Sequence, residues 1–548
     1  MSLQPRSAHE IPEETRRIAC AAFPHGTFCL AVADAVGSLY ADERFGDLFP
    51  RRGQPAEAPG RLAWVTVLQF VENLSDRAAA DAVRGRLDWK YLLGLALTDP
   101  GFDHTVLSEF RTRLGAEQGE QRLLDELLTH LQEQGLLKAR GRQRTDSTHV
   151  LAAVRTLNRL ERVGETLRAA LNGVATVAPE WLQALAPPLW YERYGHRIEN
   201  YQLPKADAAR EALAAKIGAD GQTLLDAIEA TSDYAWVGKV PAVELLRRVW
   251  EEQYHKVEGA LVWRAVADMP APATLLDSPY DPEARYSTKR SVEWVGYKVQ
   301  LTETCDVTAP HLIVNVETTA ATVPDDNMLM TVHASLARRN LLPAKHLVDK
   351  GYTSAQVLLD SAHNDGVRII RPVADDPSWQ ARTGAGFDKA HFRVDWDAQV
   401  VTCPTGRQSH SWSSKTTVPG VVAEARFSAH DCTPCPHRAD CTRAKKEPRI
   451  IGLQTREQYE VLQSARQVQT TEVFRQEYAA RAGVESTHAQ AVRRCGLRHC
   501  RYLGLAKTRL QHVVTAVAIN LIRVREWWAG TPIAPTRCSR FAALQGAA

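Results

Sequence analysis

The feature that most constrains the fold is a series of short strand-like segments that recur between helical stretches. In EWVGYKVQLTET, alternate residues from Val295 to Leu301 are apolar, which is the period-2 pattern of a half-buried strand. HLIVNVET is a second strand, and KHLVD and GVRIIRPV alternate with predicted helices. Upstream, GRQRTDSTHV reads as a strand that carries an aspartate. Strands that alternate with helices in this way predict an α/β fold.

Regions of different character interrupt this order. Residues 375–454 are rich in Pro, Gly, Ser and Cys and weakly periodic, which is typical of an inserted module. With a long helical detour removed, the order of elements matches the ribonuclease-H-like topology, a mixed sheet with helices on both faces. The predicted regions are an N-terminal helical domain (1–140), the first part of the core (141–374) with a helical insertion (about 151–270), the cysteine-containing module (375–454), the second part of the core with basic helices (455–530) and a tail (531–548).

The composition indicates the cellular compartment of the protein more clearly than it indicates a binding partner. Ten cysteines in 548 residues do not make a disulfide scaffold, and the N-terminus has no secretory signal. The longest apolar stretch, Val513 to Ile522, is shorter than the roughly 20 residues of a bilayer span. We therefore expect a reducing, cytoplasmic protein with no membrane segment. The formal net charge of +3 argues neither for nor against a nucleic-acid partner.

Three acidic residues have positions that suit metal-assisted phosphodiester chemistry. Asp146 and Asp349 are each predicted at or near the end of a strand, where open α/β sheets place ligands, and Glu485 lies on a predicted helix. Two Mg²⁺ ions bound by a few carboxylates can activate one oxygen and stabilise another. The ordinary alternative is that each is a surface or capping residue, because the chain has 64 acidic side chains.

The sequence motifs around these carboxylates resemble those of a known family. RTDSTHV, SPYDPEARYSTKR, WVGYKVQLTETCD, LVDKGYTS and YAARAGVES are similar to successive blocks of bacterial insertion-sequence DDE transposases. The similarity is greatest to the group with a Tyr-x-x-Arg-x-x-x-Glu signature, here Tyr478, Arg481 and Glu485. That group has a Lys or Arg where this chain has Val492, and here Arg493 and Arg494 follow one place late.

The resemblance implies an activity and a set of ligands. Asp146, Asp349 and Glu485 would be catalytic and would bind two Mg²⁺ (or Mn²⁺) ions. The enzyme would cleave double-stranded DNA at the ends of its element and join the 3′-hydroxyl to target DNA, as a homodimer on DNA. Tyr478 and Arg481 would contact phosphates. For Arg481 the alternative is a plain helical ion pair with Glu485, four residues on.

Basic side chains gather in three places. Arg481–Arg525 contains nine basic residues and a single acid, Glu485, which suits a metal ligand beside a phosphate track. A smaller basic group lies between the two aspartates in the sequence. A third lies on a predicted helix near the N-terminus, and the helices there form either a DNA-binding helix-turn-helix or a plain helical bundle. The expected DNA contacts outside the signature are Arg493, Arg494, Lys289, Arg290, Lys298, Arg111 and Arg113.

The inserted module carries Cys403, Cys432, Cys435 and Cys441. Four thiolates could hold a structural Zn²⁺ tetrahedrally, with His437 as a competing fourth ligand. The alternative is a set of reduced, buried cysteines.

Two other functions share most of these features. A metal-dependent nuclease of the same fold would need the three carboxylates without strand transfer. A catalytically silent DNA-binding protein derived from a transposase would need none of them intact.

Overall fold

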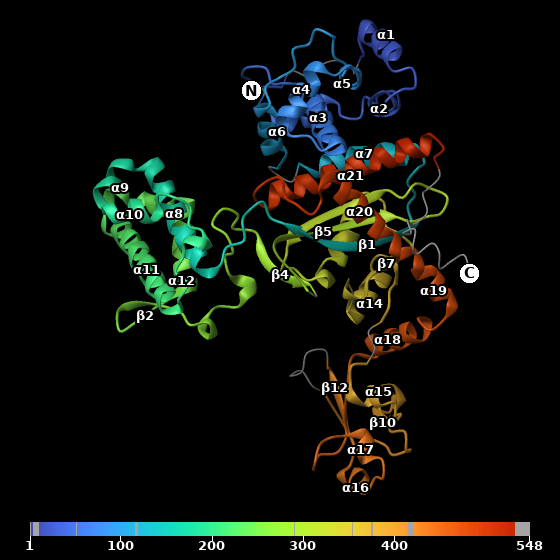
Figure 1. Cartoon of the computed structure of the whole chain (residues 1–548). Helices are drawn as coiled ribbons and strands as arrows, with labels where there is room; N and C mark the ends of the chain where they lie inside the picture. Colours follow the sequence, from blue (N-terminus) through green and yellow to red (C-terminus); the bar gives the residue numbers. More distant parts are fainter. Residues whose placement is uncertain are drawn as a thin grey trace, which may run out of the picture.

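A mixed six-stranded sheet forms the centre of the computed structural model, which describes residues 2–3, 10–50, 52–115, 119–289, 291–352, 354–373, 376–414 and 421–531 (Figure 1). The strand order is β4-β5-β1-β7-β8, and β6 also pairs with β5. β1 is antiparallel to β5 and parallel to β7, which is parallel to β8. The bounds are β1 (Arg142–Leu151), β4 (Arg285–Lys289), β5 (Val292–Thr304), β6 (Ile313–Ala320), β7 (Lys345–Val348) and β8 (Arg368–Ile370).

The sheet confirms the α/β prediction, with two differences in detail. β4 was not expected from the sequence. Asp146 lies in the middle of β1 and not near its end, because β1 continues to Leu151 in its pairing with β5. Consecutive residues of β5 from Val299 to Thr304 are all buried, so both faces of the sheet are covered there. This mixed sheet is consistent with a ribonuclease-H-like fold.

The N-terminal helices pack onto the sheet through one continuous core. Buried residues of these helices, such as Trp64 and Leu128, belong to the same hydrophobic cluster as Val299 of β5 and Val517 of the long C-terminal helix. Figure 1 shows α7 beside α21 above the sheet. The helices are α1 (Glu13–Ala22), α2 (Phe28–Val36), η1 (Asp42–Leu48), α3 (Pro59–Glu72), α4 (Asp76–Gly85), α5 (Leu87–Leu92), α6 (Thr105–Gly115), α7 (Gln121–Glu133) and α21 (Leu505–Trp528).

The helical detour leaves the sheet after β1 and returns before β4. It has its own hydrophobic cluster, which includes Trp190 and Trp250. Figure 1 shows it to one side of the sheet, so it does not obstruct the strands that carry the aspartates. Its elements are α8 (Arg159–Val177), α9 (Pro179–Leu185), α10 (Pro188–Tyr194), η3 (Asn200–Gln202), α11 (Asp207–Ala230), η4 (Ser232–Lys239), α12 (Pro241–Gln253), β2 (Tyr254–Val257), β3 (Ala260–Trp263), η5 (Val266–Asp268) and η6 (Pro272–Thr274).

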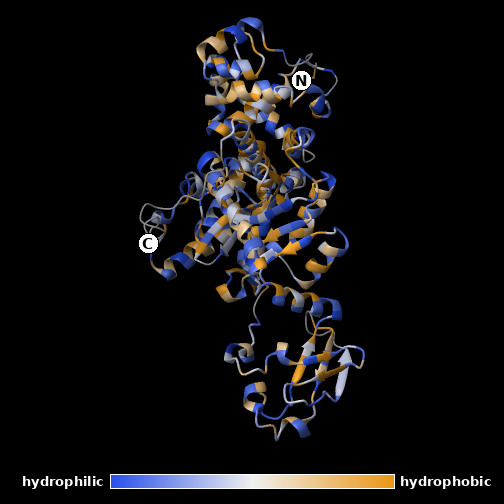
Figure 2. Ribbon diagram, turned by 90° about the vertical axis from the view of Figure 1, so that its right-hand side faces the viewer, coloured by the Kyte–Doolittle hydropathy of each residue, from blue (hydrophilic) through white to orange (hydrophobic). Residues whose placement is uncertain are grey.

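The cysteine-containing module has a small core of its own, built around Phe392 and Phe427. Figure 2 shows its hydrophobic strands apart from the central body. Its elements are α15 (Trp379–Thr383), η9 (Lys389–His391), β9 (Arg393–Asp395), β10 (Val400–Thr402), β11 (Ser411–Ser414), β12 (Ala423–Arg426), α16 (Ala429–Cys432), α17 (Arg438–Cys441) and β13 (Ile450–Leu453).

The remaining helical segments lie between β6 and α21 in the chain. They are η7 (Asp325–Asn327), α13 (Leu329–Arg338), η8 (Lys350–Tyr352), α14 (Ala355–His363), α18 (Arg456–Val468), α19 (Glu472–Ala479), η10 (Ala480–Ala482) and α20 (Gly483–Cys495). The single helix expected around Glu485 is wrong: the 3₁₀ turn η10 divides it, so Tyr478 and Glu485 lie on different helices. Among the described helices, none has the length and apolar character needed to cross a bilayer.

Candidate active site

Strand register brings the two aspartates to the same level of the sheet. Thr145 of β1 pairs with Val348, the last residue of the parallel strand β7. Asp146 directly follows Thr145, and Asp349 directly follows Val348. Neighbouring strands lie about 4.8 Å apart, so these two carboxylates start from adjacent backbone positions.

Arg481 joins the third carboxylate to the first. Its Nη2 lies 2.8 Å from Asp146 Oδ2, and its Nη1 lies 3.1 Å from Glu485 Oε1. Burial lowers the pKa of Arg481, but Asp146, Tyr478, Asp349 and Glu485 outweigh that effect and the net pKa is raised. All three predicted carboxylates therefore act on one guanidinium, contributed by the turn η10.

Two tyrosines border this cluster. Tyr478 stacks on Phe474 with ring centroids 5.6 Å apart, and burial raises its pKa. Tyr352, in the turn that follows Asp349, is buried, and burial followed by the charges of Asp325 and Asp146 raises its pKa. Both phenols therefore stay protonated at neutral pH and can donate a hydrogen bond. The Gly-Tyr wording after Asp349 was the only sequence signal for Tyr352.

Two family descriptions match the chain. Residues 402–525 match a "Transposase DDE domain", which spans Tyr478, Arg481 and Glu485 but begins after both aspartates. Residues 19–113 match a "Transposase domain (DUF772)", which covers most of the N-terminal helices. Together, the two matches support an insertion-sequence DDE transposase. No curated protein and no solved structure matches this transposase significantly.

The basic residues of this transposase do not form one continuous track. In the segment from Arg481 to Arg525, Arg523 is paired with the buried Glu303 and Arg509 lies 3.7 Å from Glu120. Arg493 and Arg494 are exposed on α20. These two arginines remain available for DNA, whereas Arg523 is part of the interior.

The other predicted DNA contacts have different surroundings. Lys298 and Lys289 lie 3.5 and 4.0 Å from Asp325, which also accepts a hydrogen bond from Ser147, next to Asp146. Asp325 is a fourth carboxylate near the site that sequence reasoning missed, because nothing local distinguishes it from a surface acid. Arg290 lies outside the described residues.

The two N-terminal arginines serve packing. Arg111 is only 5% exposed, forms an ion pair with Asp76 and lies over the ring of Tyr502. Arg113 lies over the ring of Phe49. Arg111 is therefore held by contacts within the protein, and this packing does not support the predicted DNA contact.

The four module cysteines line one cavity of about 30 Å³. Burial raises the pKa of Cys441 to about 11, Arg449 opposes this, and the other three thiols reinforce it. His437 instead stacks on Phe387, with ring centroids 5.1 Å apart, and does not line the described cavity. The four thiols are therefore neighbours, and the expected competition from His437 is not seen.

The donor chemistry of both clusters fits a metal, although neither is a closed ligand set. Among the described residues, no three His, Cys, Asp or Glu side chains converge tightly enough to hold an ion. At the carboxylates, a cation already occupies the shared position, because Arg481 stands between Asp146 and Glu485. Hard carboxylate oxygens suit Mg²⁺ or Mn²⁺, and Mg²⁺ sites are usually completed by water and substrate phosphates.

Proposed function

We propose that this transposase binds the ends of its own insertion sequence, cleaves a phosphodiester there and joins the freed 3′-hydroxyl to target DNA. The observation that supports this is the meeting of Asp146, Asp349 and Glu485 around Arg481, although they come from three separate parts of the chain. An assembly of like charges with one counter-ion costs stability, and such assemblies are concentrated at functional sites.

Asp146, Asp349 and Glu485 would hold divalent ions, two Mg²⁺ or Mn²⁺ per site. Such ions supply Lewis-acid stabilisation of the charge that develops on the phosphate oxygens. Glu485 has a side chain that is 69% exposed, so it can move toward the two aspartates when DNA is present.

Arg481 would act first on the carboxylates and then on DNA. Its planar fork can bind a phosphate as well as a carboxylate. A DNA phosphate at the site would compete for the guanidinium and release carboxylate oxygens for the ions. Tyr478, which faces the same carboxylates, would donate its hydroxyl proton to a phosphate oxygen.

Outer contacts would hold the duplex. Arg493 and Arg494 on α20, and Lys289 and Lys298 beside Asp325, would contact phosphates. Phosphate contacts position the duplex and carry no sequence information. A homodimer on DNA would bring the two ends of the element together.

The test is strand transfer with purified protein. Wild-type protein, DNA carrying the element's ends and Mg²⁺ should yield end DNA joined to a target plasmid. Asp146→Asn should bind the ends normally and lose cleavage by about 10³-fold or more, because each carboxylate carries charge that the reaction needs. Hydrolysis without joining would favour the nuclease, and binding without cleavage would favour a silent DNA-binding protein.

We also propose that Cys403, Cys432, Cys435 and Cys441 hold a structural Zn²⁺, which would draw the four thiols together and stabilise a module with a small core. Freshly purified protein should contain about one Zn per chain, as a four-thiolate site requires. Cys432→Ser should lose the zinc, and Cys495→Ser, a buried cysteine of α20, should keep it. Wild-type protein without zinc would remove this proposal.

A further inference from the structure

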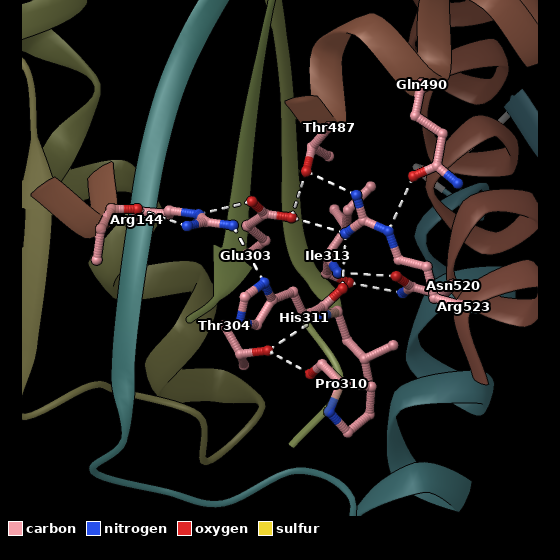
Figure 3. Close-up of polar contacts among 12 residues, drawn as sticks. Arg144, Glu303, Thr304, Pro310, His311, Ile313, Thr487, Gln490, Asn520 and Arg523 are labelled. Atoms are coloured by element: carbon pink, nitrogen blue, oxygen red, sulfur yellow. Dashed lines mark hydrogen bonds and ion pairs between the residues drawn. The ribbon is translucent and has the colours of Figure 1, made fainter. Parts of the chain in front are cut away.

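A second ion cluster, which is largely buried, is formed by side chains of β1, β5, α20 and α21 (Figure 3). Its centre is Glu303 of β5, which has no exposed surface. Arg144 Nε donates to Glu303 Oε1 at 2.7 Å, and Arg523 Nη1 donates to Oε2 at 2.7 Å. Thr487 Oγ1 donates to the same Oε2 at 2.6 Å. One carboxylate therefore ties β1, β5, α20 and α21 together.

Two of the three side-chain partners of Glu303 are close in sequence to a residue of the proposed site. Arg144 is two residues before Asp146 on β1, and Thr487 is two residues after Glu485 on α20. Arg144 also donates to the backbone oxygen of Ala480, the residue before Arg481. The cluster therefore includes residues two positions from Asp146 and from Glu485, and it bonds the backbone next to Arg481.

The start of α20 is built to accept this guanidinium. A Cβ at Gly483, the first residue of α20, would overlap the Arg144 guanidinium. On the other side, Arg523 Nη2 donates to Thr487 Oγ1 at 2.6 Å and its Nε donates to Gln490 Oε1 at 3.0 Å. The first two turns of α20 are therefore clamped between Arg144 and Arg523.

We propose that Glu303 is a positioning residue, which fixes the place of α20 on β1 and so sets the separation of the Asp146 and Glu485 carboxylates for divalent metal binding. The role rests on the proposed function of that site. Groups behind the direct ligands commonly change metal affinity by about 10- to 100-fold when they are replaced. Glu303 itself touches neither the reacting atoms nor the proposed ligands.

Asn520 provides a control within the same region. It bonds both backbone groups of Ile313, with its Oδ1 accepting at 2.7 Å and its Nδ2 donating at 2.8 Å, and so pins α21 to β6. These hydrogen bonds do not involve α20. Asn520→Leu should therefore weaken the fold of the same region while the geometry of the carboxylates is kept.

The experiment compares the metal requirement of four variants with that of the wild-type protein. Glu303→Gln should need about tenfold more Mg²⁺ for half-maximal cleavage, because Glu303 supports the elements that carry the proposed ligands. End-DNA binding should be unchanged. Glu303→Asp should recover part of the affinity. Gly483→Ala, which displaces Arg144 without touching Glu303, should behave like Glu303→Gln. Asn520→Leu should lower the thermal midpoint and leave the Mg²⁺ requirement unchanged.

Two results of the cleavage assay would overturn the role of Glu303: a wild-type Mg²⁺ requirement in Glu303→Gln, or an equal increase in Asn520→Leu. Direct Mn²⁺ binding, followed by electron paramagnetic resonance on the end-DNA complex, separates this proposal from the proposed function. If wild-type protein binds Mn²⁺ but does not cleave, the proposed function fails, and weaker Mn²⁺ binding by Glu303→Gln still supports positioning. Equal Mn²⁺ binding by both proteins refutes positioning whatever the cleavage result.

Discussion

Two ion clusters that lie a few residues apart on β1 and α20 differ in their ratio of carboxylates to guanidinium groups and in their exposure to solvent. In the buried cluster, Glu303 is shared by two guanidinia and has no exposed surface. In the candidate active site, three carboxylates share the single guanidinium of Arg481, and the Glu485 side chain is 69% exposed. The buried cluster is saturated with hydrogen bonds and is fixed. The open cluster has surplus negative charge, so it is ready to receive cations.

The difference shows how one strand can carry both structure and chemistry. Arg144 and Asp146 lie two residues apart on the same face of β1, but Arg144 is buried and Asp146 lies where the sheet meets the more open cluster. Toward the interior, a desolvated charge must be paired, because leaving it alone costs several kcal/mol. Toward the solvent, incomplete pairing costs less and can be offset by a ligand.

The largest effect should come from breaking the buried cluster. Glu303→Gln leaves two buried guanidinia without a counter-charge and should lower the free energy of unfolding at neutral pH by about 3–5 kcal/mol. Burial favours the neutral acid, but Arg523 and Arg144 outweigh it, so the pKa of Glu303 is lowered from 4.5. Its stabilisation is therefore complete above the unfolded pKa and is lost as pH falls through the folded pKa.

Chemical denaturation across the acid range tests this sign. Below pH 4.5 the gap between wild-type and Glu303→Gln should narrow by about 1.4 kcal/mol per pH unit until the folded pKa is reached. Glu317→Gln, on the neighbouring strand β6, is the control: burial raises the pKa of Glu317, so its charge is not a source of stability. A gap for Glu303→Gln that widens toward acid would contradict the assignment.

A smaller effect should follow from opening the site further. Arg481→Gln removes the internal cation, so Mn²⁺ should bind the DNA-free protein about tenfold more tightly, a change of about 1.4 kcal/mol. Cleavage should nevertheless fall by about 10²-fold, because the phosphate loses its guanidinium partner. Mn²⁺ titration and an end-cleavage assay measure the two effects.

Arg475→Gln is the matched control, since Arg475 pairs with Glu472 on α19 and should leave both quantities unchanged. Unchanged or weaker Mn²⁺ binding in Arg481→Gln would show that Arg481 does not compete with the ion.

The smallest effect should appear at the exposed cations. Arg493→Gln and Arg494→Gln should each weaken DNA binding a few-fold and lower the slope of log affinity against log salt by about one. Arg111→Gln should keep the slope but destabilise the fold, because Asp76 loses its buried partner. Equal salt slopes for all three variants would mean that Arg493 and Arg494 do not contact phosphates.

Some of the site could be predicted from the sequence, because its signals are local. The strands around Asp146 and Asp349 were predicted from their own short segments, and the Arg481–Glu485 pair follows from a spacing of four residues, even though a 3₁₀ turn interrupts the helix. The role of Arg111 could not be predicted in this way. A charged residue on a helix looks the same in the sequence whether it faces DNA or a buried aspartate.

The sequence by itself determined the family, the α/β class and the local pairs, which depend on neighbours within a turn or a strand. Only the tertiary structure decided that Glu303 pairs with Arg523, 220 residues away, and that the N-terminal helices share the core of the sheet. It also decided that Arg481 reaches Asp146 as well as Glu485. Such contacts depend on strand register and helix packing, which minimise buried unpaired charge over the whole molecule and leave no trace in a local pattern.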